Sequence, residues 1–117
     1  MILHALRPLL GAPARELPFP LPEGVQLRSG RWLTGLGGVL TRGGPAAAVT
    51  IGDTIVVHPE VPVTERLLRH ELTHVRQWRA HPWSFAWRYA WNHLRHGYHD
   101  NPYEVAARAA ERDHTEA

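Results

Sequence analysis

The residues best suited to carry out chemistry form the pattern H-E-x-x-H, made by His70, Glu71 and His74. In an α-helix, side chains four residues apart lie on one face, so both imidazoles can reach one metal ion at about 2 Å. Glu71 lies roughly 100° around such a helix from His70, which keeps it off the metal but within reach of a metal-bound water. A carboxylate there can accept the water's proton and deliver it to a leaving amine. The pattern is that of a zinc metalloprotease, with Glu71 as general base.

The residues around this motif predict that it lies on a helix spanning about residues 63–79. Leu68, Leu72 and Val75 recur at helical spacing, so one flank of the helix is expected to be buried. The alternative interpretation is a surface helix whose histidine pair and glutamate occur together by chance. We favour the metal site because the motif borders the apolar flank.

A catalytic zinc ion needs a third protein ligand and an open position for water. The downstream candidates are His81, His93, His96, His99, Asp100 and Glu104. Glu104 is preferred, because it opens a separate helix that can pack across the motif helix. The competing interpretation is a capping box, in which Glu104 bonds the backbone amide of Asn101. In that case His96 or His99 becomes the ligand.

Proline and glycine divide the rest of the chain. Residues 1–24 are expected to form an N-terminal arm and a proline-rich connector, and residues 25–117 a single domain. Strands are predicted at residues 25–28, 47–51 and 54–58, the last two joined by a Gly52-Asp53 hairpin turn. Further helices are predicted at residues 31–40, at residues 82–95 with Gly97 as the C-terminal cap, and from Asn101 to about residue 112.

The predicted helix at residues 82–95 carries an unusual aromatic stripe. Its members are Trp83, Trp87, Ala90, Trp91 and Leu94. We expect this stripe to pack against the motif helix as part of the core. The alternative is a helix at a membrane interface, where Trp, Tyr and Arg are enriched. Arg88 and Arg95 alone provide little positive charge for that role.

Composition narrows the classes of function. The chain has 117 residues and no cysteine, so a disulfide framework and a thiolate metal site are excluded. Its 13 basic residues are all arginine, but acids are interspersed and the formal net charge is only +2, so no nucleic-acid partner is expected. No apolar run reaches the length of a spanning helix, and the first ten residues lack the features of a secretory signal. We therefore expect a cytoplasmic protein without membrane association.

Two stretches resemble a known family: HELTHVRQ at residues 70–77 and NPYEVAA at residues 101–107. They are similar to the minigluzincins, small gluzincin-type zinc metallopeptidases, and to related bacterial metallopeptidase-like domains. The resemblance spans roughly residues 25–112. It implies a minimal zincin fold in which His70, His74 and Glu104 bind zinc and Glu71 is the base. The second acid of the family's N-P-x-E-x-E-A pattern is Ala106 here, which implies a weakened or altered site.

The sequence as a whole predicts an α+β fold and a zinc-dependent metallopeptidase acting on peptide or protein substrates. The substrate is expected to add to the edge strand of the sheet, either residues 54–58 or the neighbouring strand. Tyr98, His99 and Tyr103 are the candidate catalytic donors for the oxyanion. The alternative function is a zinc-binding module without turnover, which the small size of the chain and Ala106 favour. The sequence leaves the oligomeric state open.

Overall fold

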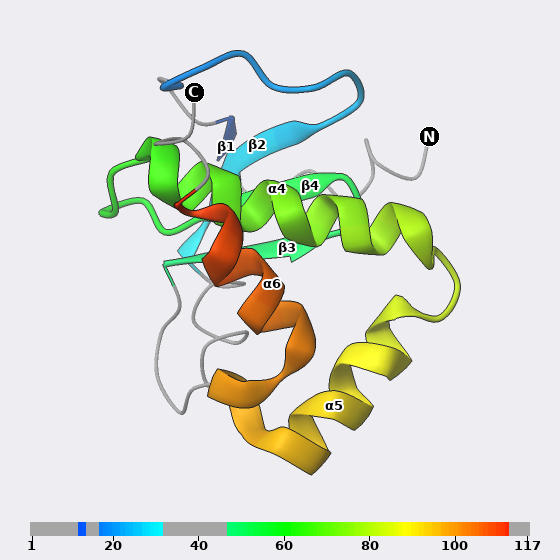
Figure 1. Ribbon diagram of the computed structural model, residues 1–117. Coiled ribbons are helices and arrows are strands. Elements are labelled where there is room, and N and C mark those ends of the chain that lie inside the picture. Colours follow the sequence, from blue (N-terminus) through cyan, green and yellow to red (C-terminus); the bar gives the residue numbers. More distant parts are fainter. Residues whose placement is uncertain (1–11, 14–16, 32–46, 113–117) are drawn as a thin grey trace.

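The structure, a computed structural model, describes residues 12–13, 17–31 and 47–112. Within these ranges it contains a small sheet and three helices that follow it in the chain. The strands are β1 (Ala12–Pro13), β2 (Gln26–Ser29), β3 (Ala48–Ile51) and β4 (Thr54–Val57), and the helices are α4 (Glu65–Ala80), α5 (Phe85–Asp100) and α6 (Pro102–Ala110). Figure 1 shows α4 lying across the sheet, with α5 leading away from its C-terminal end and α6 returning toward its N-terminal half. The predicted α+β class and minimal zincin architecture are confirmed.

The sheet has the order β1-β2-β4-β3, with β2 and β4 parallel and the other two pairs antiparallel. The predicted hairpin is present, and Gly52 takes a positive φ of 60° in its turn, a conformation that glycine adopts without strain. Because β4 lies between β2 and β3, residues 54–58 are not an edge. The first choice of the prediction is therefore wrong, and its alternative, the neighbouring strand β3, is an edge of the sheet within the part of the chain that the structure describes.

The core lies between the sheet and α4. Ile55 and Val57 of β4 are 0% and 2% exposed, and they belong to one apolar cluster with Leu68, Leu72 and Val75 of α4. These are the three residues whose spacing predicted a buried flank. Burial of this flank fixes the rotation of α4, and with it the direction in which the motif residues point.

Each helix begins near its predicted start. Thr64 caps α4, because its hydroxyl accepts a hydrogen bond from the amide of Leu67 at 3.1 Å. Asn101 caps α6 in the same way through the amide of Tyr103. Helix α5 starts and ends later than predicted, at Phe85 and Asp100, but Gly97 interrupts it with a φ of 80°, the left-handed conformation expected at a C-terminal cap.

The tryptophan stripe does not pack against α4, so that prediction is wrong. Trp83, Trp87 and Trp91 are 95%, 79% and 58% exposed. Phe85 and Tyr89 occupy the inner face of α5 instead. Phe85 is 4% exposed, with its ring 5.1 Å from that of Trp78 and 5.0 Å from that of Tyr103. Two aromatic stripes lie on α5 about two residues out of phase, and helical spacing alone could not choose between them.

Three predictions lie outside the described residues. They concern residues 1–11 and 14–16 of the N-terminal arm and connector, all but the first residue of the helix predicted at residues 31–40, and the last five residues of the predicted domain, 113–117. The described part of the connector includes β1, which pairs with β2.

No helix among residues 12–13, 17–31 and 47–112 combines the length and apolarity needed to cross a bilayer.

Candidate metal centre

Helix α4 presents the two motif histidines side by side. His70 and His74 are 8% and 7% exposed, and their ring centroids lie 5.0 Å apart. They face Glu104 of α6, because Leu68, Leu72 and Val75 hold the opposite flank of α4 in the core. The i,i+4 pairing expected from the sequence is therefore present and buried.

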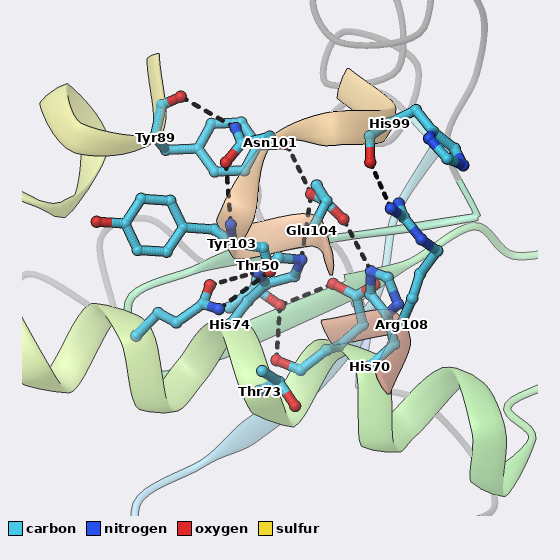
Figure 2. A network of polar contacts seen from close by, with 12 residues as sticks. Thr50, His70, Thr73, His74, Tyr89, His99, Asn101, Tyr103, Glu104 and Arg108 are labelled. Atoms are coloured by element: carbon cyan, nitrogen blue, oxygen red, sulfur yellow. Dashed lines mark hydrogen bonds and ion pairs between the residues drawn. The ribbon is translucent and has the colours of Figure 1, made fainter. Parts of the chain in front are cut away.

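Glu104 of α6 lies between the two imidazoles (Figure 2). Its Oε1 is 3.1 Å from Nε2 of His70, and its Oε2 is 3.2 Å from Nε2 of His74. Ligand atoms around a tetrahedral zinc ion, at 2.0–2.1 Å from the metal, are about 3.3 Å apart. The three residues thus offer one atom each within 4.8 Å of one another. They form the cluster of potential metal ligands found among the described residues.

The capping-box interpretation of Glu104 is not supported. The amide of Asn101 donates to the carbonyl oxygen of Tyr98, whereas both carboxylate oxygens of Glu104 are directed at other side chains. The runner-up ligands His96 and His99 are exposed, and neither belongs to the cluster.

The outer nitrogens of the two histidines are held by acceptors. Nδ1 of His70 lies 2.6 Å from a carboxylate oxygen of Glu111, and Nδ1 of His74 lies 2.8 Å from Oε1 of Gln77. The orientation of the Gln77 amide is set by its Nε2, which donates to the carbonyl of Tyr103 at 3.1 Å. Since both outer partners only accept, each Nδ1 carries the proton. Each neutral ring therefore directs the lone pair of Nε2 at Glu104.

With both rings neutral, no proton would lie between either Nε2 and the Glu104 carboxylate, and this arrangement requires positive charge. In the metal-free protein, protons provide it. Burial lowers the pKa of His74, but hydrogen bonding to Glu104 and the charges of Glu71 and Glu104 outweigh burial and raise it to about 9. Burial also lowers the pKa of His70, but hydrogen bonding to Glu104 and the charge of Glu71 outweigh burial and raise it. Burial raises the pKa of Glu104, but hydrogen bonding to His70 and His74 outweighs burial and holds it below its usual range. A divalent cation would satisfy the same three atoms, so the donor set fits a metal ion.

Two further residues fix Glu104 in place. The hydroxyl of Tyr89 donates to Oε2 of Glu104 at 2.6 Å, and burial together with the Glu104 charge raises the pKa of Tyr89. Asn101 is fully buried. Its Oδ1 accepts from the Tyr103 amide at 3.0 Å, and its Nδ2 donates to the Tyr89 carbonyl at 3.1 Å. Asn101 thereby ties the start of α6 to α5 and sets the position of Glu104, three residues further on.

The predicted base, Glu71, points toward the edge of the sheet. It is 5% exposed, and the hydroxyl of Thr50 in β3 donates to its Oε1 at 2.9 Å. A cavity of about 330 Å³ opens beside it, bordered by Val61 and Leu67 on its apolar side and by His70 and Glu71 on its polar side. The carboxylate thus lies between the edge strand, a cavity and the histidine pair.

The three predicted oxyanion donors, Tyr98, His99 and Tyr103, do not make the contacts with the two histidines that Glu104 makes. His99 is exposed and lies 3.1 Å from the Asp100 carboxylate. The Tyr103 ring stacks on that of Tyr89, and Figure 2 shows its hydroxyl directed away from the two histidines. Tyr98 is half-buried and near enough to Tyr89 to contribute to its raised pKa. The assignment of these donors stays a prediction.

Sequence reasoning missed the residues that support the site, which are Thr50, Gln77, Tyr89 and Glu111. A local signal existed for two of them. Gln77 lies three residues after His74, and Glu111 lies seven after Glu104, so each shares a helix face with a candidate ligand. Ala106, by contrast, lies roughly 200° around α6 from Glu104 and is exposed. An acid at that position would be directed away from the histidines.

The fold and the three buried ligand candidates define a zincin-like domain. Sequence comparison is consistent with this class: residues 23–82 match the family described as the eCIS core domain, which is minigluzincin-like. The chain belongs to this family. The match includes the H-E-x-x-H motif and ends before Glu104. No curated protein and no solved structure gives a significant match.

Proposed function

We propose that this domain is a zinc-dependent metallopeptidase in which His70, His74 and Glu104 hold the metal. The observation that carries the proposal is the convergence of three buried acceptors, with both outer histidine nitrogens already bonded to Glu111 and Gln77. Such outer partners orient metal-binding imidazoles and raise their basicity. Imidazole and carboxylate together suit zinc, and the chain has no thiolate to offer.

Bound zinc supplies Lewis-acid chemistry, since it lowers the pKa of a coordinated water and polarises a scissile carbonyl. Glu71 is then the proton carrier. The Thr50 hydroxyl donates to Oε1 of this buried carboxylate and fixes its orientation, and Oε2 is the oxygen that would accept the proton of the reacting water. The proton that Glu71 takes from the water passes to the leaving amine, as general acid–base catalysis requires.

The substrate in this proposal is an extended peptide that adds to β3. Among residues 12–13, 17–31 and 47–112 this strand lies at one edge of the sheet, and its Thr50 donates a hydrogen bond to Glu71. An extended chain along β3 would bring a peptide bond near Glu71, and one of its side chains could enter the cavity bordered by Val61 and Leu67. The apolar lining of that cavity favours an apolar substrate side chain.

The alternative is a zinc-binding module without turnover. The sequence favoured this alternative partly because Ala106 replaces an acid. The structure weakens that argument, because Ala106 is exposed and lies on a different face of α6 from Glu104. The small cavity still favours it over an enzyme with several substrate subsites. Metal binding without hydrolysis would distinguish this alternative.

The test compares cleavage of an unfolded protein substrate by wild-type protein and by Glu71→Gln, with the metal content of both measured. Glu71→Gln is expected to keep the metal and lose hydrolysis by at least about a hundredfold, the scale of a lost general base. The matched control is Glu60→Gln, because Glu60 is an exposed glutamate that pairs with Arg31 away from the site. Equal activity of Glu71→Gln and wild type would refute the proposed role of Glu71, and metal-loaded wild type without activity would favour the binding module.

A further inference from the structure

The outer face of α5 is an exposed apolar surface. It consists of Trp87, Trp91 and Leu94 on the helix, together with Trp83 in the turn that precedes it, and we call it the tryptophan face. Three of the four side chains are 78–95% exposed, and Trp91 is 58% exposed. In Figure 1, α5 lies at the margin of the molecule away from the strands.

The fold does not need these indoles. Phe85 and Tyr89, on the inner face of α5, make its ring contacts with Trp78, Tyr103 and His74. A buried indole covers up to about 250 Å², so the exposed fractions of the three tryptophans amount to roughly 500 Å² of mostly apolar surface. A single patch of this size is at the upper end for a monomeric protein and marks an interaction site.

The charged residues that neighbour the tryptophan face in the sequence are basic. The sequence has no aspartate or glutamate between Glu71 and Asp100, whereas it has four arginines and five histidines there. Arg88 and Arg95, next to the indoles on α5, are exposed, and neither forms an ion pair within the described residues. The two arginines are few, but no acid in residues 72–99 offsets them, so the surface is aromatic with a weakly cationic margin, which is complementary to an anionic, amphipathic partner.

From these observations we propose that the tryptophan face binds the surface of an anionic lipid bilayer. Indoles favour the headgroup region, where an apolar ring meets a polar edge, and arginines beside them pair with lipid phosphates. The helix lies in the plane of the interface in this arrangement, with Arg88 and Arg95 at the headgroups. The sequence favoured a buried stripe over this role. All three indoles are exposed in the structure, so they are not buried in the core and are available to a bilayer. Binding here is independent of the metal centre and of hydrolysis.

The experiment uses the full chain and vesicles of phosphatidylcholine and phosphatidylglycerol in a 3:1 ratio, with pure phosphatidylcholine vesicles for comparison. Co-sedimentation is expected to show binding to the anionic vesicles that weakens as salt rises, because exposed charges are screened. Each indole is expected to contribute about tenfold in partition coefficient, from partial burial of one aromatic side chain. The triple variant Trp83→Ala, Trp87→Ala, Trp91→Ala should therefore lose about a thousandfold in partition coefficient, and alanine is compatible with helix α5.

Two controls separate this effect from general stickiness. Val105→Ala removes an exposed apolar side chain on α6, 47% exposed, and should leave binding unchanged. Arg88→Gln with Arg95→Gln should reduce the preference for anionic over neutral vesicles. A lipid brominated near the headgroup should quench the tryptophan fluorescence of the wild-type protein. This measurement uses the wild-type protein alone, so it does not depend on whether a variant folds.

Three outcomes would overturn the proposal. The first is equal vesicle binding by the wild type and the triple tryptophan variant. The second is wild-type protein that binds neither kind of vesicle but self-associates through the tryptophan face, as shown by loss of the dimer in the triple variant. The third is that brominated lipid does not quench the fluorescence of the wild-type protein and that residues 1–10 cover these indoles instead. In that case, acrylamide would quench the tryptophan fluorescence more strongly after residues 1–10 are deleted.

Discussion

Replacing Asn101 by alanine tests how the fold positions Glu104. The Asn101 side chain is fully buried and makes two hydrogen bonds, one that caps α6 and one to the Tyr89 carbonyl of α5. Losing a helix cap costs about 1 kcal/mol, and losing a second buried hydrogen bond costs about 1 kcal/mol more. The small cavity that remains adds to this, so the free energy of unfolding should fall by about 2–3 kcal/mol.

The matched control is Thr64→Ala, which removes the cap of α4. Thr64 is exposed and makes the one cap bond, to the amide of Leu67, so the expected loss is about 1 kcal/mol. For a domain of this size each kcal/mol lowers Tm by about 4 °C, so Asn101→Ala should lower it by roughly 10 °C and Thr64→Ala by roughly 4 °C. Melting is followed by circular dichroism on metal-free protein, so that metal affinity does not add to the difference.

Zinc affinity provides the second measurement on the same pair of variants. Asn101→Ala should weaken zinc binding by about tenfold, because a lost outer contact misplaces the ligand Glu104, whereas Thr64→Ala should leave the affinity unchanged. If both variants melt at the same temperature and bind zinc as wild type does, then Asn101 does not set the position of Glu104, and the reasoning is refuted.

Three more predictions concern the centre itself. Glu104→Gln should lower zinc affinity by at least about a hundredfold because a neutral amide is a poor zinc ligand, while α6 keeps its Asn101 cap; unchanged affinity would remove Glu104 from the ligand set. Tyr89→Phe deletes the 2.6 Å bond to Glu104 and should weaken zinc binding by about tenfold with little effect on the fold, and an unaltered affinity would limit Tyr89 to packing. Because the pKa of His74 is raised to about 9 in the metal-free protein, zinc must displace a proton below that pH. Apparent affinity, measured against a competing chelator, should therefore rise about tenfold per pH unit from pH 7 to 9, and a flat profile would contradict this protonation state.

The local features of this fold could be predicted from the sequence because each depends on neighbouring residues. The motif helix follows from the spacing of Leu68, Leu72 and Val75, and the hairpin from a Gly52-Asp53 pair between two β-branched runs. The start of α6 follows from Asn101 and the proline after it.

The long-range features could not be predicted in the same way. The position of β4 inside the sheet depends on its parallel pairing with β2, which no local pattern specifies. The bond between Tyr89 and Glu104 depends on which of two aromatic faces of α5 turns inward, and both faces have helical spacing. In the structure, the face that turns inward carries Phe85 and Tyr89, because their rings pack with those of Trp78 and Tyr103.

The central claim is that His70, His74 and Glu104 form a metal site, and the metal content of the purified protein tests it most directly. Elemental analysis should find about one zinc per chain in the wild type and in Glu71→Gln, and none in His74→Ala or in the His70→Ala, His74→Ala double variant. Stoichiometric zinc in the double variant, with the protein still folded, would contradict the assignment.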